Sequence, residues 1–99
     1  MKVLVARIYC TEGDRAHRRI FAHLHDHTRV RGVTVFRGIS GFGRSGEVHS
    51  STLLDMSLDL PVVIEFFDEA GRVERALDEL RSEGLIQPDH VLTFAANLS

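Results

Sequence analysis

The segment L-P-V-V-I-E-F-F at Leu60–Phe67 predicts a β-strand, because it is rich in β-branched and aromatic residues and carries its proline near the start. The segment A-G-R-V-E-R-A-L-D-E-L-R-S at Ala70–Ser82 then predicts a helix. Its apolar residues recur at helical spacing, at Val73, Ala76, Leu77 and Leu80. Gly84 follows, where helices commonly end on glycine. A strand leading directly into a helix is therefore expected in this part of the chain.

Strands and helices also alternate in the rest of the sequence. Further strands are expected at Lys2–Cys10, Val33–Ile39 and Val91–Ala95, and a helix from a cap at Asp14 to about Arg29. The apolar positions of that helix are Ala16, Ile20, Leu24 and, less regularly, Phe21. The order βαββαβ predicts an α+β, ferredoxin-like sandwich, in which two helices cover one face of a four-stranded antiparallel sheet. With 99 residues, the chain is expected to form one domain over residues 1–99.

The alternation of side chains predicts what each face of this sheet carries. One face is entirely apolar, with Leu4, Ala6 and Ile8 from the first strand and Val62, Ile64 and Phe66 from the third. The other carries Val3, Val5, Arg7 and Tyr9, with Val63, Glu65 and Phe67. We expect the first face to lie under the helices. The second is still largely apolar, which predicts an oligomer in which bare sheet faces pack together. An ion pair between Arg7 and Glu65 is expected on that face.

Composition narrows the class of protein. The chain is 43% hydrophobic and 26% charged, as in soluble globular proteins, and its net charge of -2 argues against nucleic-acid binding. Its one cysteine, Cys10, rules out an intrachain disulfide. No apolar run approaches the ~20 residues of a membrane span, so we expect no membrane insertion and a cytoplasmic location.

Candidate ligand-binding residues gather in the glycine-rich stretch R-G-I-S-G-F-G-R-S-G-E-V-H-S-S, residues 37–51. Glycines permit close backbone approach, and arginines with backbone N–H groups suit an anion. A mobile anion-wrapping loop and a flexible hairpin tip are both compatible with this composition. The candidate residues are Arg37, Gly38, Gly41, Phe42, Gly43, Arg44, Ser45, Gly46 and His49.

This stretch, together with V-T-V-F before it and L-P-V-V-I-E-F-F-D at 60–68, resembles a small bacterial and archaeal family called domain of unknown function one-hundred-ninety. The resemblance spans residues 3 to about 94. That family is grouped by fold with the PII signal-transduction proteins. The resemblance implies a homotrimeric, PII-like protein in which the connection between the second and third strands corresponds to the PII effector loop.

PII proteins carry a G-F-G-R segment at the base of the effector loop, where it helps hold a nucleotide between subunits. Gly41–Arg44 matches that segment, and Gly46 and His49 resemble its continuation. The resemblance therefore implies a regulatory protein that binds a small anionic ligand, with an adenine nucleotide as one candidate, in clefts between subunits. Residues 41–57 would be the effector loop, acting on a protein or transporter target.

The chain departs from PII proteins at two places. Their phosphate-binding G-D-G-K turn, between the second helix and the last strand, is replaced by E-G-L-I-Q at Glu83–Gln87, which has no lysine. The only tyrosine, Tyr9, lies outside the loop, so the modified tyrosine of PII effector loops has no counterpart. We expect weaker nucleotide binding than that of a full PII site.

Other functions remain as alternatives. Arg31–Arg37 resembles an acylphosphatase signature, but it enters the second strand instead of joining the first strand to the first helix, so a small phosphate-ester or acyl-phosphate enzyme is less favoured. His23 and His27, four apart on a helix, suit a shared metal or a polar helix flank with His27 near the core boundary. We favour the flank, because metal sites normally need three protein ligands. A cation-binding trimer of the divalent-cation-tolerance type is the last alternative. We assign no catalytic residue, no metal and no cofactor.

Overall fold

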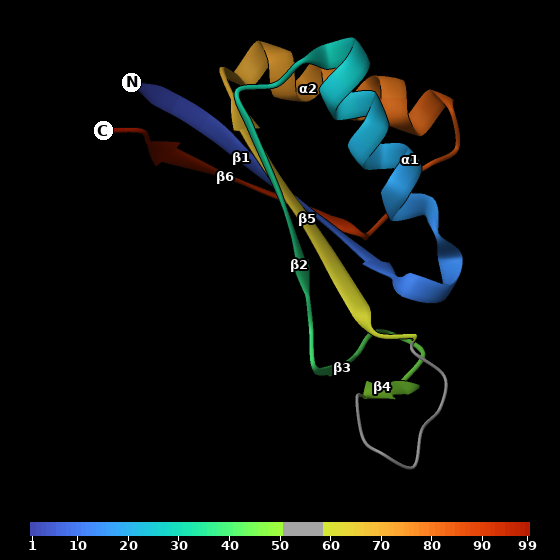
Figure 1. The fold of residues 1–99 in the computed structure, drawn as a ribbon. Helices are drawn as coiled ribbons and strands as arrows, with labels where there is room; N and C mark the ends of the chain where they lie inside the picture. Colours follow the sequence, from blue (N-terminus) through green and yellow to red (C-terminus); the bar gives the residue numbers. More distant parts are fainter. Residues whose placement is uncertain (51–58) are drawn as a thin grey trace.

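The chain folds into a four-stranded antiparallel sheet with two helices on one face, in a computed structural model that describes residues 1–50 and 59–99 (Figure 1). The strands are β1 (Lys2–Thr11), β2 (Gly32–Arg37), β3 (Ser40–Phe42), β4 (Val48–Ser50), β5 (Pro61–Asp68) and β6 (Val91–Asn97). The helices are α1 (Ala16–His23) and α2 (Ala70–Ser82), with a 3₁₀ turn η1 (Glu12–Asp14) before α1 and a π-helical turn η2 (Leu24–Thr28) after it.

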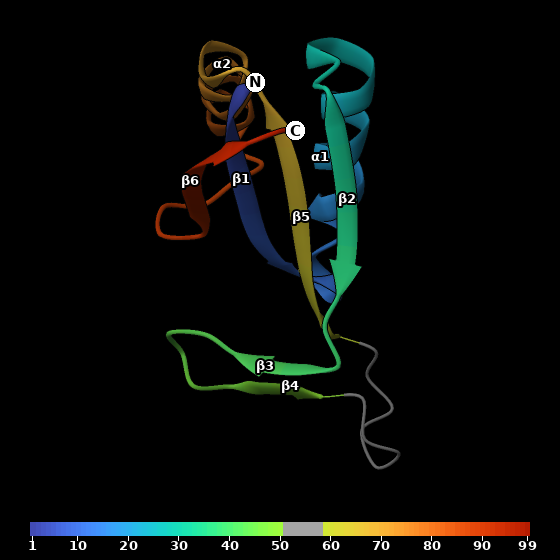
Figure 2. The ribbon, with the colours of Figure 1, turned by 90° about the vertical axis from the view of Figure 1, so that its left-hand side faces the viewer.

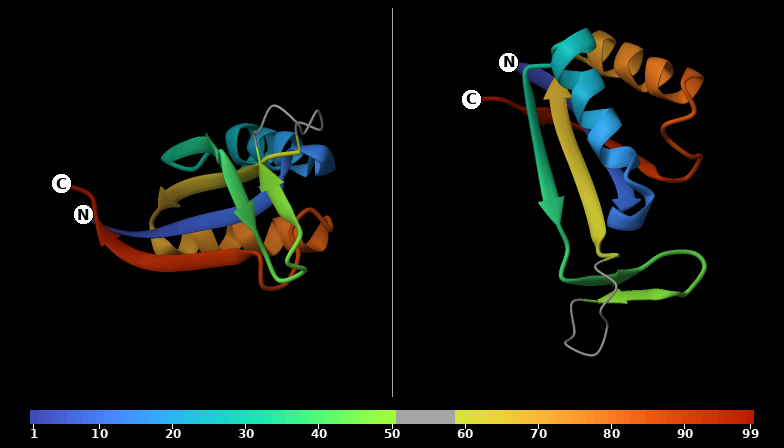
Figure 3. Two further views of the ribbon diagram at one scale, coloured as in Figure 1. Left: turned by 90° about the horizontal axis from the view of Figure 1, so that it is seen from below. Right: turned by 45° about the vertical axis from the view of Figure 1, so that its right-hand side comes forward.

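The main sheet has the strand order β2-β5-β1-β6, and every neighbouring pair is antiparallel. Figure 3 shows α1 and α2 side by side over the same face. This is the ferredoxin-like sandwich that the sequence predicts. Strands β1 and β2 both run antiparallel to β5. They therefore end at the same end of the sheet, which is also where β5 begins.

The hydrophobic core lies between the sheet and the helices, on the face predicted to be entirely apolar. Its buried side chains include Ala6, Ile8, Val62, Ile64 and Phe66 from the sheet and Ile20, Leu24, Val73, Ala76, Leu77 and Leu80 from the helices. Leu4 is only partly buried but packs against this cluster. Phe21 is exposed, as its irregular position in the helical pattern suggests.

The opposite sheet face carries no helix (Figure 2). Arg7 Nε donates a hydrogen bond to Glu65 Oε1 at 2.8 Å, which confirms the predicted ion pair, and the Arg7 guanidinium lies 5.1 Å from the centre of the Phe94 ring. The exposed apolar side chains on this face, which we name the open face, are Tyr9, Phe36, Leu92 and Phe94.

Helix α1 is shorter than the sequence predicts. Asp14 does not cap it, because residues 12–14 form a 3₁₀ turn and α1 begins after Arg15, whose backbone is left-handed (φ 60°). The helix widens into a π-helical turn at Leu24 and ends at Arg29, also left-handed (φ 53°). The two left-handed positions are arginines and not glycines, so the sequence does not indicate where the helix starts and stops. The apolar periodicity alone therefore predicted one continuous helix.

His23 corrects the expectation of a polar helix flank. Its side chain is 9% exposed, and its Nε2 lies 2.7 Å from Glu79 Oε2 on α2. Its ring stacks on that of His27, with centroids 5.0 Å apart, and His27 is exposed rather than near the core boundary. His23 therefore joins the two helices. The sequence could not show this, because Glu79 is 56 positions away.

The strand ends also differ slightly from those predicted. Strand β2 ends at Arg37 instead of Ile39, and β6 continues to Asn97. After Arg37 the chain leaves the sheet edge and forms the separate hairpin of β3 and β4, which crosses below the sheet (Figure 2). Neither α1 nor α2, nor any other helix among residues 1–50 and 59–99, has the length and apolar character that a membrane span requires.

Candidate functional site

The glycine-rich stretch forms a short antiparallel hairpin, and we call residues 38–50 the hairpin and the nine predicted ligand-binding residues the hairpin site. Strands β3 and β4 pair in the register Ser40↔Ser50, Gly41↔His49 and Phe42↔Val48. The Gly46 N–H donates to the Gly43 carbonyl at 3.0 Å, and Gly46 has a φ of 77°, which favours glycine. Residues 40–50 therefore form a paired hairpin. Residues 51–57 of the predicted effector loop lie outside the described residues.

The hairpin leaves the sheet by a close approach between Gly38 and Pro61. The Gly38 N–H donates to the Pro61 carbonyl at 2.7 Å, and a Cβ on Gly38 would lie 2.8 Å from Pro61 Cγ. Gly41 is also near, since its Cβ would lie 3.3 Å from the same atom. By contrast, a Cβ on Gly43 or Gly46 would meet nothing within 4 Å. Glycine at position 38 therefore permits the close approach at which the hairpin starts, and Gly46, with its positive φ, shapes the exposed turn.

Arg37, at the end of β2, is paired with Glu12 of the turn after β1. Arg37 Nε lies 2.7 Å from Glu12 Oε1, and Nη2 donates to Oε2 at 3.0 Å. The Leu60 N–H also donates to Glu12 Oε2, at 3.4 Å. The hydrogen bond from Arg37 is the main reason that the pKa of Glu12 is lowered from its ordinary value. This pair joins the ends of β1 and β2 to the start of β5.

His49, on β4, lies close to Asp59. Its Nδ1 is 3.4 Å from Asp59 Oδ2, and its side chain is 19% exposed. The other carboxylate oxygen, Asp59 Oδ1, accepts a hydrogen bond from the Gly13 N–H at 2.6 Å. Asp59 therefore joins β4 to the turn after β1, beside the Arg37–Glu12 pair.

Arg44 lies in the turn of the hairpin and reaches Asp89, which precedes β6. Arg44 Nη1 is 3.2 Å from Asp89 Oδ2, and the two side chains are 90% and 77% exposed. Seen from below, the hairpin crosses the lower end of the sheet and its tip comes near the α2–β6 connection (Figure 3). Ser45 shapes the same turn, since its Oγ accepts a 3.3 Å hydrogen bond from the Glu47 N–H.

The hairpin also exposes apolar side chains. Ile39 is 78% exposed, Phe42 74% and Val48 60%. Phe42 and Val48 are direct cross-strand partners, so they form one patch on the hairpin. Three strongly exposed apolar residues on so short a segment are typical of a contact surface.

The structure therefore divides the hairpin site into two groups. Arg37, Gly38, Gly41 and His49 gather at its base, near the start of β5, whereas Gly43, Arg44, Ser45 and Gly46 lie at its tip. Phe42 lies between the groups, on the exposed patch. The three carboxylates that pair with these basic residues were not among the residues predicted from the sequence. Their position could have been predicted from the topology. It places the residues that follow β1 and those that precede β5 and β6 at the same end of the sheet.

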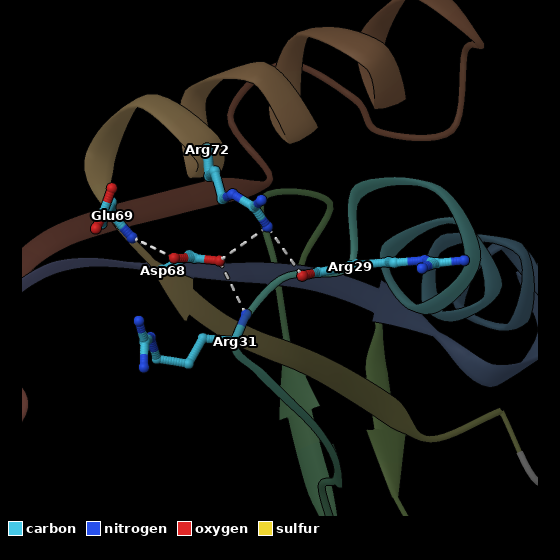
Figure 4. Close-up of a pocket in the computed structure, with 5 residues that line it drawn as sticks. All are labelled: Arg29, Arg31, Asp68, Glu69 and Arg72. Carbon is cyan, nitrogen blue, oxygen red and sulfur yellow. Dashed lines mark hydrogen bonds and ion pairs between the residues drawn. The ribbon is translucent and has the colours of Figure 1, made fainter.

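A separate pocket of about 430 Å³ lies at the other end of the sheet, where β5 ends and β2 begins, and is lined by Arg29, Arg31, Asp68, Glu69 and Arg72 (Figure 4). Asp68 is its buried centre, accepting hydrogen bonds from the Arg31 N–H (3.0 Å) and the Glu69 N–H (2.7 Å). The Arg29 and Arg31 side chains extend in opposite directions. This arrangement joins the connection between η2 and β2 to the end of β5 and the start of α2, and it shares no residue with the hairpin site.

Metal binding and thiol chemistry are both disfavoured in the part of the chain that the structure describes. No group of three or more His, Cys, Asp or Glu side chains in residues 1–50 and 59–99 is arranged to hold a metal ion. Burial raises the pKa of the Cys10 thiol to about 11, so it is protonated and unreactive near neutral pH.

Comparison with known proteins identifies relatives. Residues 3–92 match the family DUF190, described as "Uncharacterized ACR, COG1993". A UPF0166 protein of Aquifex aeolicus (strain VF5) is 32% identical over 97 residues, which cover 92% of each chain.

Solved structures with the same fold include PII-like proteins and CutA1 proteins. CPII from Thiomonas intermedia K12, bound to ADP and bicarbonate, matches with a TM-score of 0.69 and 20% identity over 99% of this chain and 89% of that one. The divalent ion tolerance protein CutA1 from Ehrlichia chaffeensis matches with a TM-score of 0.61 and 12% identity over 98% and 81%. These likenesses show a fold common to PII-like and CutA1 proteins, and the match over residues 3–92 shows that the chain belongs to the DUF190 family.

Proposed function

We propose that this chain is a single-domain PII-like regulatory protein that binds a small anionic ligand through the hairpin site. An adenine nucleotide is the first candidate. The observation that carries this proposal is the exposed turn formed by Gly43, Arg44 and Gly46 on a fold shared with a protein solved with ADP and bicarbonate. The hairpin residues have binding roles here and no catalytic role.

The chemistry of the site supports an anion. Arg44 is 90% exposed and Arg37 is 54% exposed, so a ligand can reach both guanidinium groups. A guanidinium gives strong hydrogen bonds to phosphate or carboxylate oxygens. The open space beside Gly43 and Gly46 also lets a ligand approach the backbone N–H groups of the turn.

We further propose a homotrimer, with the ligand in clefts between subunits. The open face supports it, because Tyr9, Phe36, Leu92 and Phe94 are between 38% and 51% exposed in the single chain. Packing open faces together would remove this apolar surface from water and would also enclose the Arg7–Glu65 pair.

The target of regulation would bind the hairpin. We propose a protein partner, a transporter among the candidates, that covers the patch of Ile39, Phe42 and Val48, since a large exposed apolar patch favours protein contact. A cytoplasmic location suits this role, and the single free Cys10 is compatible with a reducing compartment.

Calorimetry with mono-, di-, tri- and cyclic adenine nucleotides and with bicarbonate tests the proposal, together with limited trypsin digestion of the hairpin. We expect at least one of these anions to bind and to slow cleavage after Arg44. If none binds, and the cleavage rate is the same with every anion, the ligand-sensing function is wrong and the hairpin is better explained as a fixed protein-binding element.

A further inference from the structure

All three basic side chains of the hairpin site face carboxylates that lie outside the hairpin. The pairs are Arg37–Glu12 at 2.7 Å, His49–Asp59 at 3.4 Å and Arg44–Asp89 at 3.2 Å. An anion entering the site must therefore compete with a carboxylate for each basic group. The carboxylates also add negative charge, so the site has no excess of positive charge to attract a highly charged anion.

The three pairs differ in how firmly they are held. Glu12 is 24% exposed and also accepts the Leu60 N–H, whereas Asp59 is 36% exposed and also accepts the Gly13 N–H. Asp89 is 77% exposed, and within the described part of the chain its carboxylate contacts Arg44 alone. Exposed ion pairs contribute little to stability, so the pair at the tip is the easiest of the three to exchange for a ligand.

We propose, on the basis of the function proposed above, that Asp89 determines the charge selectivity of the hairpin site. Without ligand, Asp89 holds Arg44. When an anion binds Arg44, the Asp89 carboxylate stays beside that anion and repels it, and this repulsion grows with the charge of the ligand. A nucleoside monophosphate therefore binds better than a triphosphate that brings no metal ion to neutralise it.

The same exchange connects ligand binding to the position of the hairpin. Arg44–Asp89 is the contact between the tip and the α2–β6 connection, and the two pairs at the base remain when it opens. A ligand that takes Arg44 thus releases the tip from the α2–β6 connection while the base stays attached. The ligand therefore binds the hairpin with its tip released more tightly than the hairpin with its tip held by Asp89. A ligand can change the position of the hairpin only if it has such a difference in affinity. Because the ligand itself covers the Arg44 side chain that trypsin must bind, cleavage after Arg44 is still slowed when ligand is present.

Asp89→Asn tests this role, because it removes the charge and keeps the shape of the side chain. Asp78→Asn is the matched control, since Asp78 is 79% exposed and pairs with Arg81 at 3.3 Å on α2, away from the hairpin. Calorimetry with AMP and ATP, without divalent metal, gives the ratio of the two affinities. Trypsin cleavage after Arg44 in ligand-free protein reports how tightly the tip is held.

We expect wild type to bind AMP at least as tightly as ATP. In Asp89→Asn, we expect the affinity ratio to shift toward ATP by about threefold or more and cleavage to accelerate by about threefold, as loss of an exposed ion pair allows. Asp78→Asn should change neither. The inference is wrong if wild type prefers ATP, or if Asp89→Asn leaves either the ratio or the cleavage rate unchanged. If neither nucleotide binds to any variant, the proposed function fails, and the cleavage rate alone decides whether Asp89 holds the tip.

Discussion

Arg7 and Glu65 are direct partners on the two central strands of the sheet, and their side chains meet at 2.8 Å in the middle of the open face. Both are only partly exposed in the single chain, at 42% and 26%. The ion pair lies beside the Phe94 ring, so it gives a largely apolar face a charged contact with a defined direction. In an assembly it would help to set how the subunits are oriented.

The first prediction concerns this face. Phe36→Glu should convert particles of about three chains into monomers that keep their secondary structure, because Phe36 is 51% exposed in the single chain but would be buried between subunits. Light scattering coupled to size exclusion, with circular dichroism, measures both properties. Phe21→Glu is the control, since Phe21 is 42% exposed but lies on α1. A wild-type monomer, or equal dissociation of the control, would contradict the prediction.

The second prediction concerns Arg44. Arg44→Ala should weaken binding of whichever anion binds wild type by about 1.5–3 kcal/mol, the range for a hydrogen bond to a charged group. Calorimetry measures this difference. Arg81→Ala, which removes an exposed arginine on α2, should leave the affinity unchanged. Equal losses in the two variants would show that Arg44 acts only through the net charge of the protein.

The third prediction separates the two kinds of glycine in the hairpin. Gly38→Ala should lower the free energy of unfolding by about 1–3 kcal/mol, because the new Cβ would lie 2.8 Å from Pro61 Cγ. Gly43→Ala should change it by less than about 0.5 kcal/mol, since a Cβ there meets nothing within 4 Å. Urea denaturation measures both variants. The account of the hairpin base fails if the two are equally stable.

The fourth prediction concerns the contact between the helices. His23→Ala should lower the free energy of unfolding by about 1–3 kcal/mol, because it removes a buried ring that contacts Glu79 at 2.7 Å. His25→Ala, at a side chain that is 76% exposed, should have little effect in the same urea titration. A His23 variant as stable as wild type would restore the view that these histidines form only a polar flank.

The fifth prediction concerns acid. The pKa of Glu12 is lowered from its ordinary 4.5, chiefly by the hydrogen bond from Arg37, so ionised Glu12 stabilises the folded chain above pH 4.5. That stabilisation should disappear as the pH falls from 4.5 through the lower pKa of the folded state. Unfolding free energies measured across this range should fall less steeply in Glu12→Gln than in wild type. Parallel curves would mean that the pair does not persist in solution.

The fold was largely predictable because its elements are marked by local patterns. The alternation in β1 and β5 correctly assigned the two sheet faces, and the spacing in α2 correctly gave both its limits and its buried stripe. The Arg7–Glu65 pair followed from topology, since it joins equivalent positions on neighbouring strands. Each of these predictions depends on periodicity or register, which a sequence displays directly.

The details of the site were less predictable because they depend on contacts between distant segments. Arg44 and Asp89 are 45 positions apart, and Arg37 and Glu12 are 25 apart. The π-helical turn at Leu24–Thr28 has no glycine or proline to reveal it. The hairpin turn was within reach of sequence reasoning, which held a hairpin tip and a mobile loop as alternatives and could not choose between them.

Because the contact at the tip of the hairpin is an exposed ion pair, ionic strength should affect the position of the tip. At physiological salt the screening length is about 8 Å and at 1 M it is about 3 Å, so concentrated salt weakens an exposed ion pair such as Arg44–Asp89 more than partly buried ones. A crystal grown from concentrated salt would therefore favour a displaced tip even without ligand. Such a structure would resemble the response to a ligand while reporting only the composition of the solution.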